Sequence, residues 1–262
     1  MKLLINDEDC IGCGQCKSVC IRDNIEIDDV AYELGSNCFE CGHCMAICPT
    51  GAVTLKIFKG REDKITENGQ SDVLEYDVLL EFLKRRRSIR WFKKKKIDKD
   101  TFNKIFKGAY YSPSAQNQQD VEFVVVDKKL DAFMKHVYDI IKVEEDEFFR
   151  IKEFGDYLKD KSSKEFHPLL WEGTQLILTF STDKTSAVIA NTRLELLAYS
   201  LGLGGFYSLF ILKADEIDHD KLMEFFPDIN KDKHMYSSFI IGYPKKRFRR
   251  TVPHDEINIT FM

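Results

Sequence analysis

Apolar residues recur along the larger, C-terminal part of the chain with two different periods. In the segment 76–87 they fall at Val78, Leu79, Phe82 and Leu83, which is the spacing of one helical face. The short β-branched run 121–126 (VEFVVV) instead predicts a strand. The same criteria predict helices at 98–110, 130–141 and 186–201 and strands at 175–181 and 236–242. Helices interleaved with strands predict a layered fold of the α+β or α/β class.

One stretch of this part lacks a clear period. Residues 142–171 are charged, aromatic and irregular over about 30 positions, a length at which a connection is usually functional or disordered. We expect helix or mobile cover here.

Composition limits the classes of protein to consider. The chain has 262 residues, of which 44% are hydrophobic and 31% charged, enough for a substantial core and for two domains. Its longest apolar runs, such as 176–180 (LILTF), are shorter than the roughly 18 residues of a membrane span. The N-terminus, MKLLINDEDC, lacks the apolar stretch of a secretory signal, so we expect a cytoplasmic protein without membrane partners.

Charge and cysteine content draw the same boundary in the chain. Residues 1–56 hold four basic and nine acidic side chains, a net of −5, while the whole chain carries only −4. All eight cysteines also lie in these 56 residues. We therefore predict an N-terminal domain at 1–58 and a second domain at 72–262. The turn-rich stretch 59–71 (KGREDKITENGQS) is predicted to be the linker.

The cysteines form two copies of the pattern C-x2-C-x2-C-x3-C. The copies are Cys10, Cys13, Cys16, Cys20 and Cys38, Cys41, Cys44, Cys48. Disulfides would require an oxidising compartment, and zinc sites use paired C-x2-C knuckles with a long spacer. Iron–sulfur clusters explain the spacing better, because three thiolates this close can wrap one face of a cubane while the fourth projects away.

In two-cluster ferredoxins the fourth cysteine of each run ligates the other cluster. The assignment here is Cys10, Cys13, Cys16 and Cys48 for one [4Fe-4S] cluster, and Cys20, Cys38, Cys41 and Cys44 for the other. Residues 1–56 thus resemble a bacterial two-[4Fe-4S] ferredoxin. Ile21 replaces the proline expected after the first run, which removes no ligand, and His43 is expected to be a neighbour of a cluster.

Four further stretches resemble the nitroreductase family of FMN flavoproteins. They are 85–92 (RRRSIRWF), 112–119 (SPSAQNQQ), 201–205 (LGLGG) and 242–250 (GYPKKRFRR), in the family's order over residues 75–254. The resemblance implies an α+β sandwich that forms a homodimer, with FMN at the subunit interface. Together with the cysteine-rich domain, the chain resembles the ferredoxin-fused nitroreductases of anaerobes.

The basic stretches suit the phosphate of FMN, which calls for guanidinium groups and a hydroxyl donor. Arg86, Arg87, Ser88 and Arg90 supply this set, and Arg250, with Arg247 as a second candidate, closes the far side. The alternative is a solvated basic face, which we accept for the lysines at 93–96.

The polar and glycine-rich stretches suit the flavin ring. Asn117 and Gln119 offer amides to the pyrimidine edge, and the resemblance makes Pro113, Ser114 and Ala115 flavin neighbours. At Gly204 and Gly205, a backbone N–H could approach the flavin N5 without a side chain in the way. The alternatives are a polar turn at 112–119 and a helix cap with Gly202 in the left-handed conformation.

Two departures from the family pattern leave the identity of the substrate undetermined. Asp120-Val121 stands where family members often have Pro-Trp, and 142–171, a region that commonly lines the substrate mouth, does not match the common pattern. No side chain is assigned as catalytic. The candidate proton donors, each more commonly a packing or surface residue, are Tyr110, Tyr111, His136, His167 and Tyr207.

The expected function is an FMN-dependent oxidoreductase. Electrons from a soluble donor such as ferredoxin or flavodoxin, or from NAD(P)H, would pass through two clusters to FMN and reduce a small organic acceptor such as a nitroaromatic or a quinone. The alternatives are reduction of an activated C=C or C–halogen bond and electron transfer to a protein partner. Nucleic-acid binding is suggested by KKKK at 93–96, but the net charge of −4 counts against it.

Overall fold

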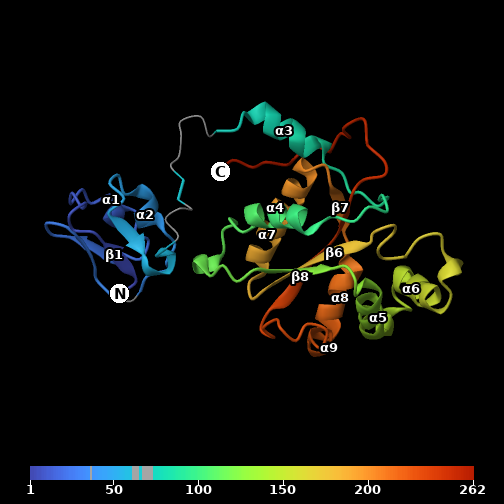
Figure 1. The fold of residues 1–262 in the computed structure, drawn as a ribbon. Coiled ribbons are helices and arrows are strands. Elements are labelled where there is room, and N and C mark those ends of the chain that lie inside the picture. Colours follow the sequence, from blue (N-terminus) through green and yellow to red (C-terminus); the bar gives the residue numbers. More distant parts are fainter. Residues whose placement is uncertain (36, 61–64, 67–72) are drawn as a thin grey trace. The chain divides into compact units, whose positions relative to one another are not determined.

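The computed structural model describes residues 1–35, 37–60, 65–66 and 73–262 (Figure 1). They form two compact units: Met1–Val73 with Gln116–Gln118, and Leu74–Ala115 with Gln119–Met262. Most of the predicted linker at 59–71 lies outside the described residues, so the domain limits at 58 and 72 stay predictions.

The first unit is built from two short antiparallel strand pairs and two short helices. Strand β1 (Leu3–Ile5) pairs with β4 (Val53–Leu55), and β2 (Ile25–Ile27) pairs with β3 (Ala31–Glu33). Helices α1 (Gln15–Ser18) and α2 (His43–Ile47) begin at equivalent positions inside the two cysteine runs. A 3-10 turn, η1 (Lys56–Phe58), follows β4. The buried core combines a few aliphatic side chains with Cys16 and Cys44. Cysteines therefore supply part of the packing of this small unit.

The second unit is organised around one antiparallel sheet. Its strands are β5 (Glu122–Val126), β6 (Gln175–Ser181), β7 (Gly204–Tyr207) and β8 (His234–Gly242), in the order β5-β6-β8-β7. Each neighbouring pair is antiparallel, with Val124 opposite Leu178 and Leu178 opposite Ser238. The predicted α+β class is confirmed by this sheet and its helical layers.

Helices cover both faces of the sheet (Figure 1). Because side chains alternate along a strand, Ile177 and Phe239 face one layer while Leu176 and Leu178 face the other. The first layer contains α4 (Lys99–Ala109) and α7 (Lys184–Ser200). The second contains α5 (Leu130–Ile141), α6 (Phe149–Lys159), α8 (Leu209–Ile217) and α9 (His219–Met223). None of the described helices is both long enough and apolar enough to span a bilayer.

Helix α3 (Tyr76–Arg85) differs from the others because none of its residues is buried. Its predicted apolar stripe is present, yet Val78, Leu79 and Leu83 are 58%, 40% and 43% exposed. Phe82 contacts Tyr199 of α7, with ring centroids 4.8 Å apart. The described residues of one chain thus leave most of this stripe uncovered.

The irregular stretch 142–171 is helical in its middle. Two 3-10 turns, η4 (Lys142–Glu144) and η5 (Lys161–Ser163), flank helix α6. Ile151 and Phe154 of α6 are fully buried against the core of the unit. Of the two expected forms, packed helix is therefore the one present at 149–159.

His167 lies at the end of this stretch, in an aromatic environment. Its ring centroid is 4.8 Å from that of Phe154 and 5.0 Å from that of Tyr157. Its Nδ1 accepts the backbone N–H groups of Leu169 (3.1 Å) and Leu170 (3.2 Å), which requires this nitrogen to be unprotonated. Burial accordingly lowers the pKa of His167 to about 4.

We expect the neutral His167 to make the second unit sensitive to acid. Its folded pKa lies below the unfolded value of about 6.5, so the unfolded chain binds the proton first as pH falls, and the stabilisation present above 6.5 is lost toward pH 4. From pH 7.5 to pH 5 the loss is about 2 kcal/mol. Urea unfolding of the full chain, followed by fluorescence of Trp91 and Trp171, measures it in the unit that contains both tryptophans.

The control variant is His167→Asn, whose side-chain oxygen can accept the same N–H groups but does not titrate. The wild type should lose about 2 kcal/mol more than this variant between the two pH values. Equal losses in the two proteins would contradict the role assigned to His167.

Candidate functional site

The two cysteine runs fold in the same way. Gly14 and Gly42 take equivalent left-handed conformations, with φ of 74° and 78°, immediately before α1 and α2. Glycine adopts this conformation without a steric penalty. The turn lets each helix start inside its cysteine run, so that Cys16 and Cys44, the third cysteine of each run, are buried in the core.

The eight cysteines surround two separate cavities in the first unit. One is lined by Cys10, Cys13, Cys16 and Cys48, and the other by Cys20, Cys38, Cys41 and Cys44. These are the two crossed sets that the sequence predicts. His43 lines the second cavity beside the cysteines, and Ile21, the residue in place of proline, lies there as well. That each set holds a cluster stays a prediction.

Hydrogen bonds from the backbone reach three of the sulfur atoms. The N–H groups of Ala31, Asn24 and Glu40 lie 3.4, 3.3 and 3.3 Å from Sγ of Cys10, Cys20 and Cys38, respectively. Such bonds stabilise negative charge on the sulfur and tune the reduction potential of a bound cluster.

The thiols of the second set are crowded. Burial, followed by the charges of the neighbouring Cys38, Cys41 and Cys20, raises the pKa of Cys44 to about 11. Burial also raises the pKa of Cys38. Thiolates held this close repel one another unless a cationic centre offsets their charge. Bound iron supplies that charge, so this donor set fits an iron–sulfur cluster.

In the second unit, the residues expected to hold the FMN phosphate follow α3 along the edge of the sheet. The N–H of Ile89 donates to the carbonyl of Gly205 in the edge strand β7, at 2.9 Å. Ile89 is buried, Arg87 and Arg90 are half-buried, and Ser88 is exposed. The segment is therefore anchored by its apolar residue, while its polar side chains remain accessible.

The second basic stretch starts beside the first. Phe92 and Pro244 form an antiparallel bridge, flanked by hydrogen bonds from Lys93 N–H to the Tyr243 carbonyl (2.8 Å) and from Lys245 N–H to the Trp91 carbonyl (2.9 Å). Arg86, Ser88 and Arg90 precede Phe92 on one side of this bridge, and Arg247 and Arg250 follow Pro244 on the other. Arg247 and Arg250 are exposed.

Close packing within the unit is enough to explain why residues 204 and 205 are glycines. A Cβ atom at Gly204 would lie 2.5 Å from the Ile89 side chain, and one at Gly205 would lie 2.5 Å from the Phe239 ring. The segment 86–90 and strand β8 can approach β7 only because these side chains are absent. Gly202 has φ of 75° after the end of α7, which confirms the capping conformation considered for this position.

The polar loop expected to meet the flavin ring has an unusual backbone. Gln116, Asn117 and Gln119 have φ of 50°, 56° and 51°, in the left-handed region that costs a non-glycine residue on the order of 1 kcal/mol or more. The Ser114 hydroxyl accepts the Gln119 N–H at 2.9 Å, and the Ala115 N–H donates to the Ser186 hydroxyl at 3.1 Å. Pro113 and Ala115 are exposed. Strain of this kind is typical of binding loops.

Asp120, which replaces the proline of the family pattern, has a structural role. Its carboxylate accepts the Thr182 N–H (2.7 Å) and the Ser181 hydroxyl (3.0 Å), which fixes the loop to the end of β6. Although burial acts in the opposite direction, these bonds hold the pKa of Asp120 below its usual value.

Sequence reasoning missed a polar network that reaches Arg86. Glu195 of α7 accepts from Arg86 (2.9 Å) and from the Tyr207 hydroxyl (3.1 Å). Asn191 donates to the same hydroxyl (2.9 Å) and accepts from Thr179 (3.0 Å). Asn191 and Glu195 are four residues apart on one helix, so the shared face could have been found from the spacing.

The candidate proton donors have different surroundings. Burial and the charge of Glu195 raise the pKa of Tyr207. His136 is hydrogen-bonded through Nε2 to the Lys221 carbonyl (2.7 Å), and His167 lies among aromatic rings. Tyr110 and Tyr111 are more than 60% exposed. These surroundings do not single out any of the five side chains as a catalytic acid.

Trp171 links the stretch 142–171 to the segment 86–92. Its indole lies 5.8 Å from the Arg90 guanidinium and 5.7 Å from that of Arg150, and it meets Trp91 edge-on at 5.8 Å. The next residue, Glu172, accepts the Phe92 N–H at 3.1 Å. The end of the predicted substrate-mouth region is thereby held against the predicted phosphate-binding segment.

Comparison with known families identifies the larger part of the chain. Residues 83–243 match the model of the nitroreductase family. The chain belongs to the nitroreductase family. Residues 9–52 match a 4Fe-4S dicluster domain, so this nitroreductase carries an N-terminal iron–sulfur domain. Both resemblances found in the sequence are confirmed.

Solved nitroreductases share the fold at low sequence identity. One from Bacteroides fragilis with bound FMN is 19% identical, with a TM-score of 0.55 over 70% of this chain and 98% of that one. One from Desulfitobacterium hafniense with bound FMN is 16% identical, with a TM-score of 0.53 over 69% and 97%. An iodotyrosine deiodinase bound to FMN and 3-iodo-L-tyrosine is 22% identical, with a TM-score of 0.51 over 70% and 98%. No curated protein matches the chain.

The crossed cysteine sets can be tested with double variants. Cys20→Ala with Cys41→Ala changes one predicted set, so about four of about eight iron atoms per chain should remain. Cys20→Ala with Cys13→Ala changes both sets, so both clusters should be lost. Iron and sulfide analysis after anaerobic reconstitution distinguishes the pairs, and an uncrossed arrangement gives the opposite ranking.

Proposed function

We propose that this nitroreductase takes electrons through two [4Fe-4S] clusters and, with FMN, reduces a small organic acceptor such as a nitroaromatic or a quinone by two electrons. The observation that carries the proposal is the presence of two four-cysteine cavities on the same chain as a nitroreductase fold. When bound, the clusters carry single electrons and FMN accepts them and delivers a pair.

The residues around β7 support FMN binding. Arg87, Ser88 and Arg90 offer guanidinium and hydroxyl donors to a phosphate, and Arg247 and Arg250 lead away from the same strand bridge. Arg86 donates to Glu195 through one of its five N–H groups, so donors remain for a phosphate. The three solved structures compared with this chain all contain FMN.

Glu195 and Tyr207 would position Arg86 for this role. The carboxylate of Glu195 is held on its other oxygen by the Tyr207 hydroxyl, which Asn191 also contacts. A tyrosine hydroxyl is protonated at neutral pH, and the raised pKa of Tyr207 keeps it a donor at higher pH as well. The guanidinium of Arg86 is thereby fixed at the end of α3 beside the polar segment.

The uncovered stripe of α3 supports a homodimer. A ten-residue helix with no buried side chain gains little from one copy of the chain, and apolar helix faces of this kind are usually covered by a partner. We propose that a second copy covers Tyr76, Val78, Leu79 and Leu83.

The second candidate function is reductive cleavage of a carbon–halogen bond. It is favoured by the fold shared with the deiodinase, which was solved with 3-iodo-L-tyrosine. A panel containing a nitroaromatic, a quinone, an enone and an iodophenol separates the two functions, because the preferred acceptor is the one with the largest kcat/KM.

The proposed electron path is tested with reduced ferredoxin as donor and a nitroaromatic as acceptor, under anaerobic conditions. Cys41→Ala should lower ferredoxin-supported turnover at least about tenfold, because one cluster is lost. FMN content should stay unchanged. The control is Ser18→Ala, at an exposed position inside the first cysteine run. Undiminished turnover in Cys41→Ala would contradict the path, and absence of turnover with any acceptor would favour electron transfer to a protein partner.

A pair of neighbouring arginines tests the phosphate site. Arg86→Gln should weaken FMN binding at least about tenfold, since a charge-assisted hydrogen bond is worth about 1.5–3 kcal/mol. Arg85→Gln should have little effect, because Arg85 is exposed and its guanidinium pairs with Glu81 one helical turn away. Fluorescence titration of the flavin-free protein with FMN measures both, and equal affinities would remove Arg86 from the site.

A further inference from the structure

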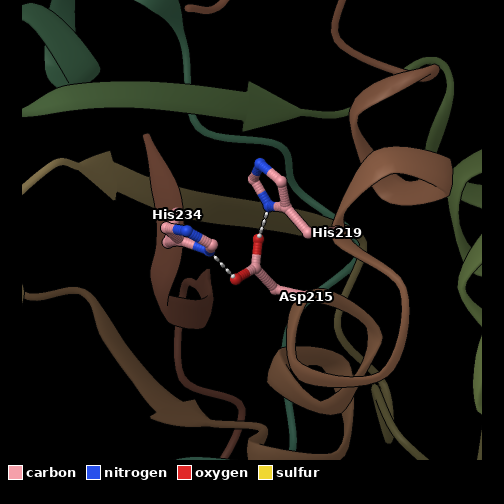
Figure 2. A group of neighbouring side chains, drawn as sticks. All are labelled: Asp215, His219 and His234. Carbon is pink, nitrogen blue, oxygen red and sulfur yellow. Dashed lines mark hydrogen bonds and ion pairs between the residues drawn. The ribbon is translucent and has the colours of Figure 1, made fainter. Parts of the chain in front are cut away.

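A cluster of two histidines and one aspartate lies in the second unit, among residues to which neither the FMN site nor the cysteine cavities give a role. Asp215 comes from α8, His219 from α9 and His234 from the start of β8. One potential ligand atom from each residue lies within 4.8 Å of the other two. Figure 2 shows the carboxylate between the two imidazole rings.

The carboxylate binds one imidazole with each oxygen. Oδ1 of Asp215 lies 2.8 Å from Nδ1 of His219, and Oδ2 lies 2.8 Å from Nδ1 of His234. The Met235 N–H also donates to Oδ1, at 3.2 Å. Asp215 is only 8% exposed, so its charge is largely removed from water and held by these groups. A buried carboxylate needs such compensation.

The outer hydrogen bond of His219 orients the ring as a ligand. Nε2 lies 2.7 Å from the Lys231 carbonyl, which can only accept, so Nε2 carries a proton. Nδ1 faces the carboxylate, which also only accepts, so without a metal Nδ1 donates a proton to Asp215. A bound cation would replace that proton and take the Nδ1 lone pair. A metal-bound histidine shows the same arrangement, in which the second ring nitrogen donates to a carbonyl.

The two imidazoles are close to each other as well as to the carboxylate. Their ring centroids are 4.1 Å apart, a separation at which two positively charged rings would repel. One divalent cation would replace the two Nδ1 protons and bind both rings and the carboxylate at once. The His234 side chain is 44% exposed, so solvent can reach the cluster and complete the coordination of a metal.

We infer that Asp215, His219 and His234 form a binding site for a divalent transition metal, with Zn²⁺ as the ion whose ligand preference they match best. Zinc takes imidazole nitrogen and carboxylate oxygen at about 2.0–2.2 Å, and three protein ligands plus water complete a tetrahedral site. Ligand atoms in such a site are about 3.3 Å apart. The two 2.8 Å contacts would open slightly, which the partly exposed His234 can accommodate.

Zinc here would connect three elements of the second layer. Helices α8 and α9 are joined by a short turn at Asp218, and the metal would tie both to the first residue of β8. Because the metal binds the folded arrangement, it would raise the stability of the second unit as its concentration rises.

The test uses the full chain with its clusters and FMN loaded anaerobically, so that the cysteines are occupied. Titration calorimetry with ZnCl₂ at pH 7.5 should show about one zinc per chain. His234→Ala and His219→Ala should each weaken this binding at least about tenfold. His136→Ala is the matched control, since it removes a histidine with an equivalent 2.7 Å bond to a backbone carbonyl, and its zinc binding should equal that of the wild type.

A second readout guards against loss of folding. Zinc should raise the thermal unfolding temperature of the wild type and of His136→Ala but not that of His234→Gln, whose position is exposed enough to accept the change. Iron content is measured before and after each titration. Zinc affinity unchanged in both His234 variants would overturn the proposal. So would a wild type that binds no zinc, or binds it only as cluster iron is lost.

Discussion

The hydrogen bond between Ile89 and Gly205 sets the geometry of the nitroreductase unit around its expected site. It holds the segment after α3 against the edge of the sheet, and the bridge between Phe92 and Pro244 continues the same alignment. The contact is possible because Gly204 presents no side chain to Ile89. The two basic stretches, which are far apart in the sequence, are thereby joined side by side at the Phe92–Pro244 bridge.

A comparable dependence governs the iron–sulfur domain, although there the constraint is chemical. Its core contains few aliphatic side chains and includes Cys16 and Cys44, so the residues that pack the unit are among those expected to bind iron. Burial raises the pKa of both thiols. Folding and cluster insertion would therefore be coupled, because bound iron would supply the charge that makes close approach of the thiolates favourable.

Much of this architecture could be predicted from local patterns. The strand at 175–181 and the helix at 130–141 have the predicted bounds, since both have a strong apolar pattern. The crossed cysteine sets were predicted from the two C-x2-C-x2-C-x3-C runs together with the pattern of two-cluster ferredoxins. Strand β7 was missed because its sequence, GGFY, begins with two glycines, which have low strand propensity. It forms a strand because it pairs with β8. Glu195 and Asp215 were missed since their importance arises from residues that only the tertiary fold brings near.

The exposed stripe of α3 has a practical consequence for the protein in solution. Arg86 caps this helix, so the position of its guanidinium depends on how firmly the helix is held. If a second copy supplies the missing contacts, subunit association and retention of the yellow prosthetic group become linked equilibria. Dilution would then release both together, and colour loss during purification at low concentration would report dissociation rather than chemical damage.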